Sequence, residues 1–210
     1  MRRLLLTLML VGALPAEGAV IDHIAATIDR DVITLTEVEQ VVAARIIQRS
    51  AGETEEAYRR RALDTLIAQA LRYRDVIRFG AEDVTRDSVE ARLLEIQARF
   101  ASPEAFLEVL ERIELPLENL RSLITRQLQV NAYIEERFSP LVFVSIEEIE
   151  TYYSTTWLPQ RLSRGLPRVP LGEVREEIRA LLKAERLDAE IARWTAQLRA
   201  RANVDIYVYR

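Results

Sequence analysis

The sequence LGEVREEIRALLKAERLDAEIARWTAQLRARANVDIYV, residues 171–208, predicts one long helix that ends in a short strand. Its apolar residues recur at spacings of three and four, the period of an α-helix with a buried face. Asn203 ends this pattern, and the alternation over residues 204–209 is typical of a strand. A helix over residues 171–202 would be ~48 Å long, well beyond the ~16 Å radius of gyration of a compact chain of this size. We therefore expect an elongated or cradle-shaped body.

The segment before this helix is short and rich in residues that break helices. Residues 157–170 contain three prolines and a glycine, which predicts a loop. A folded unit of fewer than ~40 residues rarely stands without disulfides or metal, and the chain has no cysteine. We therefore expect no additional domain between Tyr153 and Leu171. On the near side of this gap, Ser145 and Glu148 form a predicted capping box that opens a helix through Tyr153.

The N-terminal half predicts a hairpin followed by helices. Residues 20–28 and 32–35 are rich in β-branched side chains, with a polar turn at residues 29–31. Thr36 and Glu39 predict a capping box that opens a helix to about Arg49. Further helices are expected from Thr54 to Gly80, over residues 85–100, from Ser102 with Pro103 in its first position, and after Pro116.

The first residues have the order of a secretory signal. Arg2 and Arg3 precede an apolar run over residues 4–14, and small residues follow at Gly18 and Ala19. The run is shorter than the ~20 residues that span a bilayer. We expect residues 1–18 to be removed on export to the periplasm, and stable membrane insertion is not expected. The alternative is an N-terminal helix buried in the mature fold.

Composition narrows the function further. The net charge of −4 argues against nucleic acid as the main partner. His23 is the only histidine and there is no cysteine, so a His-based metal site, a thiol nucleophile and a catalytic triad lack their residues. Pairs of glutamates such as Glu55–Glu56 lie in the first turns of predicted helices, where they are explained by the helix dipole rather than by catalysis or metal binding. The sequence contains no glycine-rich phosphate loop. We expect no catalytic residue, cofactor or metal.

Aromatic residues are the remaining candidates for a site. Most aromatics at helical spacing belong to a core, but in an elongated body some could line a groove for an apolar ligand. The candidates cluster beside the gap, beside the short helix at residue 102, and on the last helix: Phe100, Phe106, Tyr152, Tyr153, Trp157 and Trp194.

Several segments together resemble SurA-type periplasmic chaperones. VIDHIAATIDRDVITLTEVE (residues 20–39) is similar to the start of the mature family proteins, and LDTLIAQALRYRDVIRFG (63–80) to their second helix. VSIEEIETYY (144–153) resembles the segment that leads into a parvulin-type prolyl isomerase domain, and residues 170–208 resemble the closing helix and strand. The resemblance implies a mainly α fold with a small β-sheet, in which the last strand pairs with the N-terminal hairpin.

The resemblance also implies a division of the chain and a function. Residues 19–153 and 171–210 would form one SurA-like helical domain, with a linker at 154–170 where relatives carry the isomerase. Isomerase activity is not carried over, because His23 is too isolated to build that site. The implied function is an ATP-independent chaperone that reversibly binds unfolded clients such as outer-membrane proteins. The alternatives are a protein related to prolyl isomerases and a non-catalytic adaptor that holds one folded envelope protein.

Overall fold

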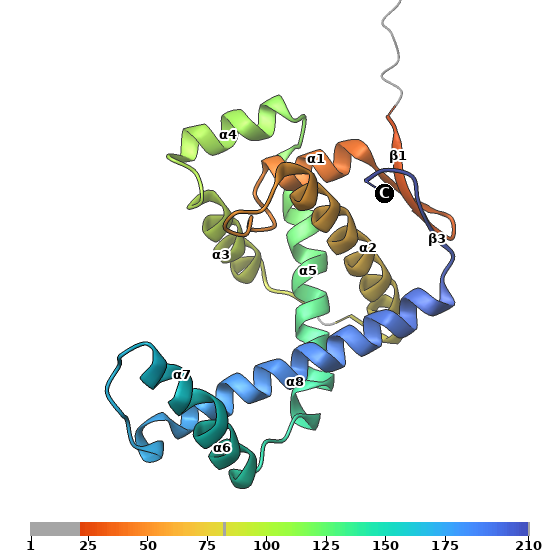
Figure 1. Cartoon of the computed structure of the whole chain (residues 1–210). Helices are drawn as coiled ribbons and strands as arrows, with labels where there is room; N and C mark the ends of the chain where they lie inside the picture. Colours follow the sequence, from red (N-terminus) through yellow and green to blue (C-terminus); the bar gives the residue numbers. More distant parts are fainter. Residues whose placement is uncertain (1–21, 82, 210) are drawn as a thin grey trace, which may run out of the picture.

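The computed structural model describes residues 22–81 and 83–209. The predicted signal at residues 1–18 lies outside them. The fold is mainly helical with a small antiparallel sheet (Figure 1). In chain order its elements are β1 (Ile24–Ile28), β2 (Asp31–Thr34), α1 (Leu35–Ala43), α2 (Glu55–Phe79), α3 (Arg86–Gln97), α4 (Pro103–Arg112), α5 (Leu117–Arg137), η1 (Ser139–Leu141), α6 (Ile146–Tyr152), η2 (Tyr153–Trp157), α7 (Leu158–Ser163), α8 (Leu171–Arg201) and β3 (Val204–Ile206).

The sheet joins the two ends of the described chain, which confirms the expected pairing of the last strand with the N-terminal hairpin. Its order is β2-β1-β3, and both pairs are antiparallel. Asp29, in the left-handed region at φ 54°, forms the turn of the hairpin. Its N–H donates to the carbonyl of Asn203, and its Oδ1 accepts from the N–H of Asn203, both at 2.8 Å. These bonds hold the end of α8 against the hairpin.

The start of α1 differs from the prediction by two residues. Thr34, not Thr36, is the N-cap, and the capping box is completed by Glu37 rather than Glu39. The reason is that β2 runs directly into the helix, so its last extended residue is already placed to cap. Glu39 instead binds Arg59 on α2, with 2.7 Å between Oε1 and Nε. The helix also ends at Ala43, six residues before Arg49, because Arg45 adopts a left-handed φ of 52°.

The other predicted helix starts before the gap hold, but α3 ends at Gln97 rather than near Phe100. Thr54 caps α2, and Gly80 ends it at a φ of 99°. Ser102 caps α4, with Pro103 in the first turn. Thr85 caps α3, and α5 follows Pro116. The capping box of Ser145 and Glu148 opens α6 as expected.

The loop expected over residues 157–170 is wrong in its first half. A π-helical turn, η2, continues α6, and α7 then runs to Ser163. Pro159 lies in the first turn of α7, just after the π-helical turn, at the point where the helical hydrogen-bond pattern changes. Only residues 164–170 are irregular, beginning at Arg164 and Gly165. A proline count alone does not distinguish a helix start from a loop.

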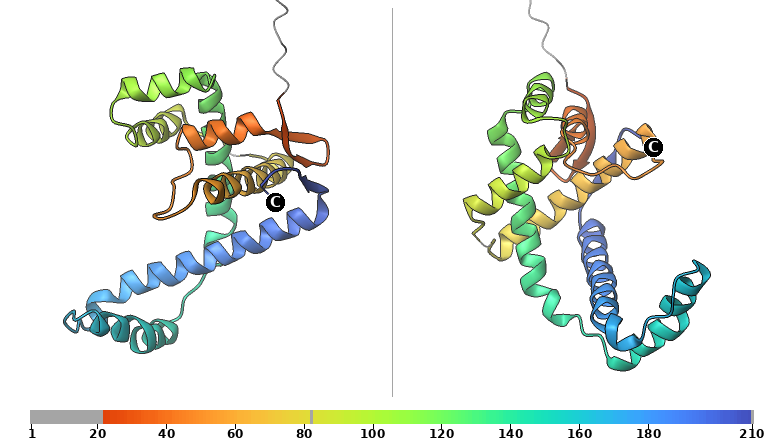
Figure 2. Two further views of the ribbon diagram at one scale, coloured as in Figure 1. Left: turned by 45° about the horizontal axis from the view of Figure 1, so that its top comes forward. Right: turned by 90° about the vertical axis from the view of Figure 1, so that its left-hand side faces the viewer.

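Within the described residues, the buried apolar side chains form separate clusters rather than one core. One joins the sheet to α1 and α2, a second joins α3, α4 and α5, and a third lies where α2, α5 and the second half of α8 meet. The fourth is small and lies between α6 and the start of α8. We call residues 142–182 the arm and the other described residues the body. Figure 2 shows the arm projecting from the body, with α8 running from one to the other. The outline is therefore elongated, as expected from the long helix.

Candidate functional site

The two predicted aromatics next to α4 belong to the core of the body. Phe106 is only 2% exposed. Phe100 is half-buried and packs against it, with 5.3 Å between ring centroids. The side chain of Phe106 therefore offers almost no surface to a ligand, while Phe100 is partly accessible.

The aromatics of the arm are half-buried and hold its helices together. Tyr153 and Trp157 stack with 5.8 Å between ring centroids, and the hydroxyl of Tyr153 donates to the carbonyl of Val169 at 2.8 Å. Tyr152 packs against the same cluster. The structure thus brings Tyr152, Tyr153 and Trp157 together, as the sequence predicts, and gives each of them a packing role.

Trp194 joins α8 to the body. Its Nε1 donates to Oδ2 of Asp75 at 3.0 Å. Its ring lies 5.6 Å from that of Tyr133 and 5.2 Å from that of Phe138, measured between centroids. Trp194 is thus half-buried at the joint between α2, α5 and α8, away from the other predicted aromatics.

The largest exposed apolar side chains near the joint of arm and body come from a segment that sequence reasoning missed. Leu141, Phe143 and Ile146 are 75%, 74% and 56% exposed, whereas Val142 and Val144 between them are buried. We call Leu141, Phe143 and Ile146 the junction strip. The sequence does show an apolar run at residues 141–144. It does not show which of these side chains are buried and which are exposed.

The backbone of the junction strip is held in place from α8. Arg186 donates to the carbonyl of Phe143 and to the carboxylate of Glu148. The N–H of Ser145, helped by the Arg186 guanidinium, lowers the pKa of Glu148 below its usual value. The strip is therefore presented on a fixed support rather than on a free loop.

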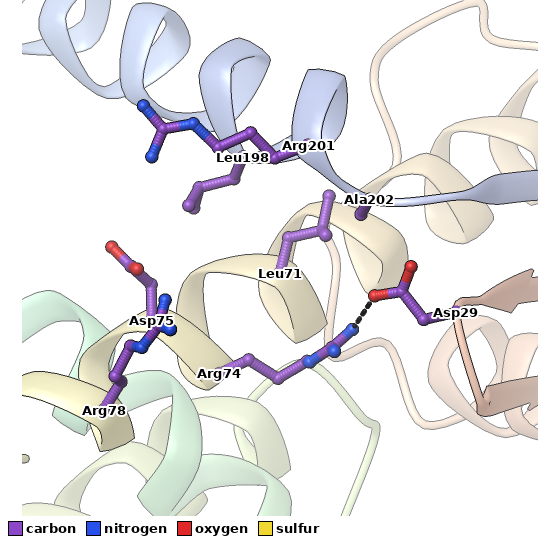
Figure 3. Close-up of a pocket in the computed structure, with 8 residues that line it drawn as sticks. All are labelled: Asp29, Leu71, Arg74, Asp75, Arg78, Leu198, Arg201 and Ala202. Carbon is purple, nitrogen blue, oxygen red and sulfur yellow. Dashed lines mark hydrogen bonds and ion pairs between the residues drawn. The ribbon is translucent and has the colours of Figure 1, made fainter.

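Several cavities of the body are lined by charged residues, and two of them bear on the site. One, of about 830 Å³, lies between the end of α1, the start of α2 and α4. A smaller one of about 360 Å³ lies between α2 and α8 (Figure 3). There Nη1 of Arg74 donates to Oδ2 of Asp29 at 2.9 Å, and the N–H of Asn203 together with Arg74 lowers the pKa of Asp29. We interpret the smaller cavity as part of the contact between the hairpin, α2 and the end of α8, in which Asp29 bonds to Arg74 and to Asn203.

The described residues show little that resembles a reaction centre. Among residues 22–81 and 83–209, no group of three or more histidine, cysteine or acidic side chains is placed to hold a metal ion. His23 is exposed just before β1, and its carbonyl accepts from the N–H of Leu35. In the same part of the chain, no helix is long and apolar enough to cross a membrane.

Comparison with known proteins assigns the chain to no family. No protein-family model matches the chain, and no curated protein matches it significantly. The resemblance to SurA-type chaperones stays a prediction.

Proposed function

We propose that this protein is an ATP-independent chaperone of the periplasm that reversibly holds apolar segments of unfolded proteins, outer-membrane proteins among them. The observation that carries the proposal is the junction strip. Three large apolar side chains lie within six residues and are each more than half exposed. Exposed apolar groups that are gathered on a fixed support mark binding surfaces. The proposed activity involves no chemical step and no cofactor.

The strip suits an extended client. Leu141 ends η1, Val142 is extended and buried, and Phe143 is exposed again, so exposed and buried side chains alternate over these three residues. Strands of outer-membrane barrels alternate apolar and polar side chains with the same period. An unfolded segment of such a protein can therefore lay its apolar face along the strip while its polar face stays in water.

The expected strength of this contact explains why holding would be reversible. Complete burial of one large apolar side chain stabilises by about 1.5–3 kcal/mol, so three partly covered ones offer about 3–6 kcal/mol. Association costs about 4–15 kcal/mol. The strip alone therefore binds weakly, and stable holding requires further segments of the same client to contact other parts of the surface.

The proposed fold family is that of the SurA core without its isomerase domains. Two features support it: the last strand returns to the N-terminal hairpin, and the chain passes from the arm into α8 through residues 164–170 only. The exposed joint would lie where the relatives' inserted domain begins.

The test is suppression of aggregation. An outer-membrane β-barrel protein is diluted from urea, and light scattering is followed with increasing amounts of the protein. We expect suppression by the wild type and a clear loss for the double variant Leu141→Ser, Phe143→Ser. The matched control is Leu94→Ser, because Leu94 is a 62% exposed leucine on α3. No suppression by the wild type at stoichiometric excess would refute the function; equal suppression by the double variant would refute the strip as its site.

A further inference from the structure

The cavity between α1, α2 and α4 combines an apolar wall with an excess of positive charge. Its volume of about 830 Å³ falls in the range of pockets that enclose one compact ligand. Phe100, Ile47 and Val109 contribute apolar surface. Four arginines and two glutamates also line it: Arg45, Arg49, Arg99, Arg112, Glu55 and Glu108.

Two of these arginines lie where helices end. Arg45 follows the end of α1, and Arg99 follows the end of α3. Each donates from Nη1 to the carbonyl of the other, and Arg99 also donates to the carbonyl of Ile46 at 3.1 Å. Arg45 lies over the ring of Phe100, 4.7 Å from its centroid. These bonds leave most of the N–H groups of both guanidiniums available, since each guanidinium has five.

The positive charge of the cavity is not balanced from within. Among residues 22–81 and 83–209, no carboxylate forms an ion pair with Arg45, Arg99 or Arg112. Arg49 pairs with Glu55 at 2.8 Å, and Glu55 also pairs with Arg59 at 3.0 Å. The two helix ends supply about −0.5 charge each, and Glu108 supplies one negative charge. Three cations against about two negative charges leave about one positive charge, which a single carboxylate would neutralise.

We propose that this cavity binds the C-terminal carboxylate of a polypeptide and the apolar side chain of its last residue. A terminal residue carries both groups on one Cα atom, so the carboxylate can reach Arg112 and Arg99 while the side chain contacts Phe100. An internal acidic residue would need room for the chain to enter and leave. Capture of a terminal carboxylate is a known mode of peptide recognition. The inference rests on the proposed function only in taking an unfolded polypeptide as the ligand.

Fluorescence anisotropy with three labelled pentapeptides tests the proposal. The first, Gly-Ser-Ala-Leu-Phe, has a free C-terminal carboxylate; the second is its amide; the third is Gly-Asp-Ala-Leu-Phe amide, which carries its charge internally. We expect the amide to bind about tenfold more weakly than the free acid, because charge-assisted hydrogen bonds to the carboxylate are lost. The peptide with internal aspartate should bind like the amide. Equal binding of the free acid and the amide would overturn the proposal, and so would recovery of full affinity by the internal aspartate.

Two variants connect the effect to the cavity. Arg112→Gln should weaken the free acid about tenfold and leave the amide unchanged, since Arg112 is exposed and takes no part in the bonds between the helix ends. Arg175→Gln, at an exposed arginine of α8, is the matched control and should change neither. Equal effects of the two variants would overturn the assignment. Light scattering with Arg112→Gln separates this proposal from the proposed function, because the junction strip is intact and suppression of aggregation should persist in this variant.

Discussion

The arm should unfold independently of the body when its small core is damaged, and Ile178→Ala is the sharpest perturbation. Ile178 is 0% exposed and packs in a cluster with Val144, Ile149 and Val174. Replacing a buried isoleucine by alanine costs about 2–5 kcal/mol. Because the arm has so few buried side chains, this loss removes much of its local stability. The apolar clusters of the body share none of these residues, so the local stability of the body should not change.

Hydrogen exchange followed by mass spectrometry measures the effect segment by segment. A loss of 2 kcal/mol raises exchange from locally opened states by roughly thirtyfold, at about 1.4 kcal/mol per factor of ten. We expect this rise in α6, α7 and the first turns of α8, with α2 and α5 unchanged. Ile67→Ala, the same substitution at a 0% exposed residue of the body, is the matched control. It should raise hydrogen exchange in the sheet and α2 instead. A uniform rise across the chain in Ile178→Ala would refute the division into arm and body.

Three further predictions concern stability and export. The hydrogen bonds from Arg61 lower the pKa of Glu53 from 4.5 to about 2, so the stabilisation by Glu53 is complete above pH 4.5 and disappears as the pH falls through 2. The Tm difference between wild type and Glu53→Gln should follow this course, and a difference that persists below pH 2 would contradict it. Asp29→Ala should lower the free energy of unfolding in urea, because the N–H of Asn203 and Arg74 lose their acceptor. Asp188→Ala on the exposed part of α8 should change the free energy of unfolding by less than about 0.5 kcal/mol. Equal losses in the two variants would refute the role of Asp29 in joining the hairpin to the end of α8. Mass spectrometry of the exported chain should find cleavage after Gly18 or Ala19, and an intact N-terminus would contradict the predicted signal.

The helices could be predicted where local chemistry decides the boundary. Thr54, Ser102 and Ser145 cap in the structure as their positions indicate, and Gly80 ends α2. The start of α1 could not be fixed in this way, because Thr34 with Glu37 and Thr36 with Glu39 are overlapping capping signals. The choice between them comes from tertiary structure, since β2 continues to Thr34 and the N–H of Leu35 bonds to His23.

The candidate site was harder to predict than the fold. The sequence singles out aromatic residues, but Phe106 is buried and Trp194 joins α8 to the body, because large rings are the most effective filling between helices. The junction strip is exposed because the arm covers only one side of residues 141–144. Val144 is covered by its contact with Val174 and Ile178 of α8, which lie far away in the chain. A pattern of neighbouring residues holds no information on that contact.

Site-specific photocrosslinking from the junction strip tests the central claim most directly. Phe143 is replaced by a photoreactive phenylalanine analogue, and the protein is irradiated with an unfolded outer-membrane protein or with the same protein after folding in detergent. We predict strong crosslinking to the unfolded client, little to the folded one, and little from the analogue at Leu94 in either case. Equal crosslinking from positions 143 and 94 would contradict the account, and so would equal crosslinking to folded and unfolded clients.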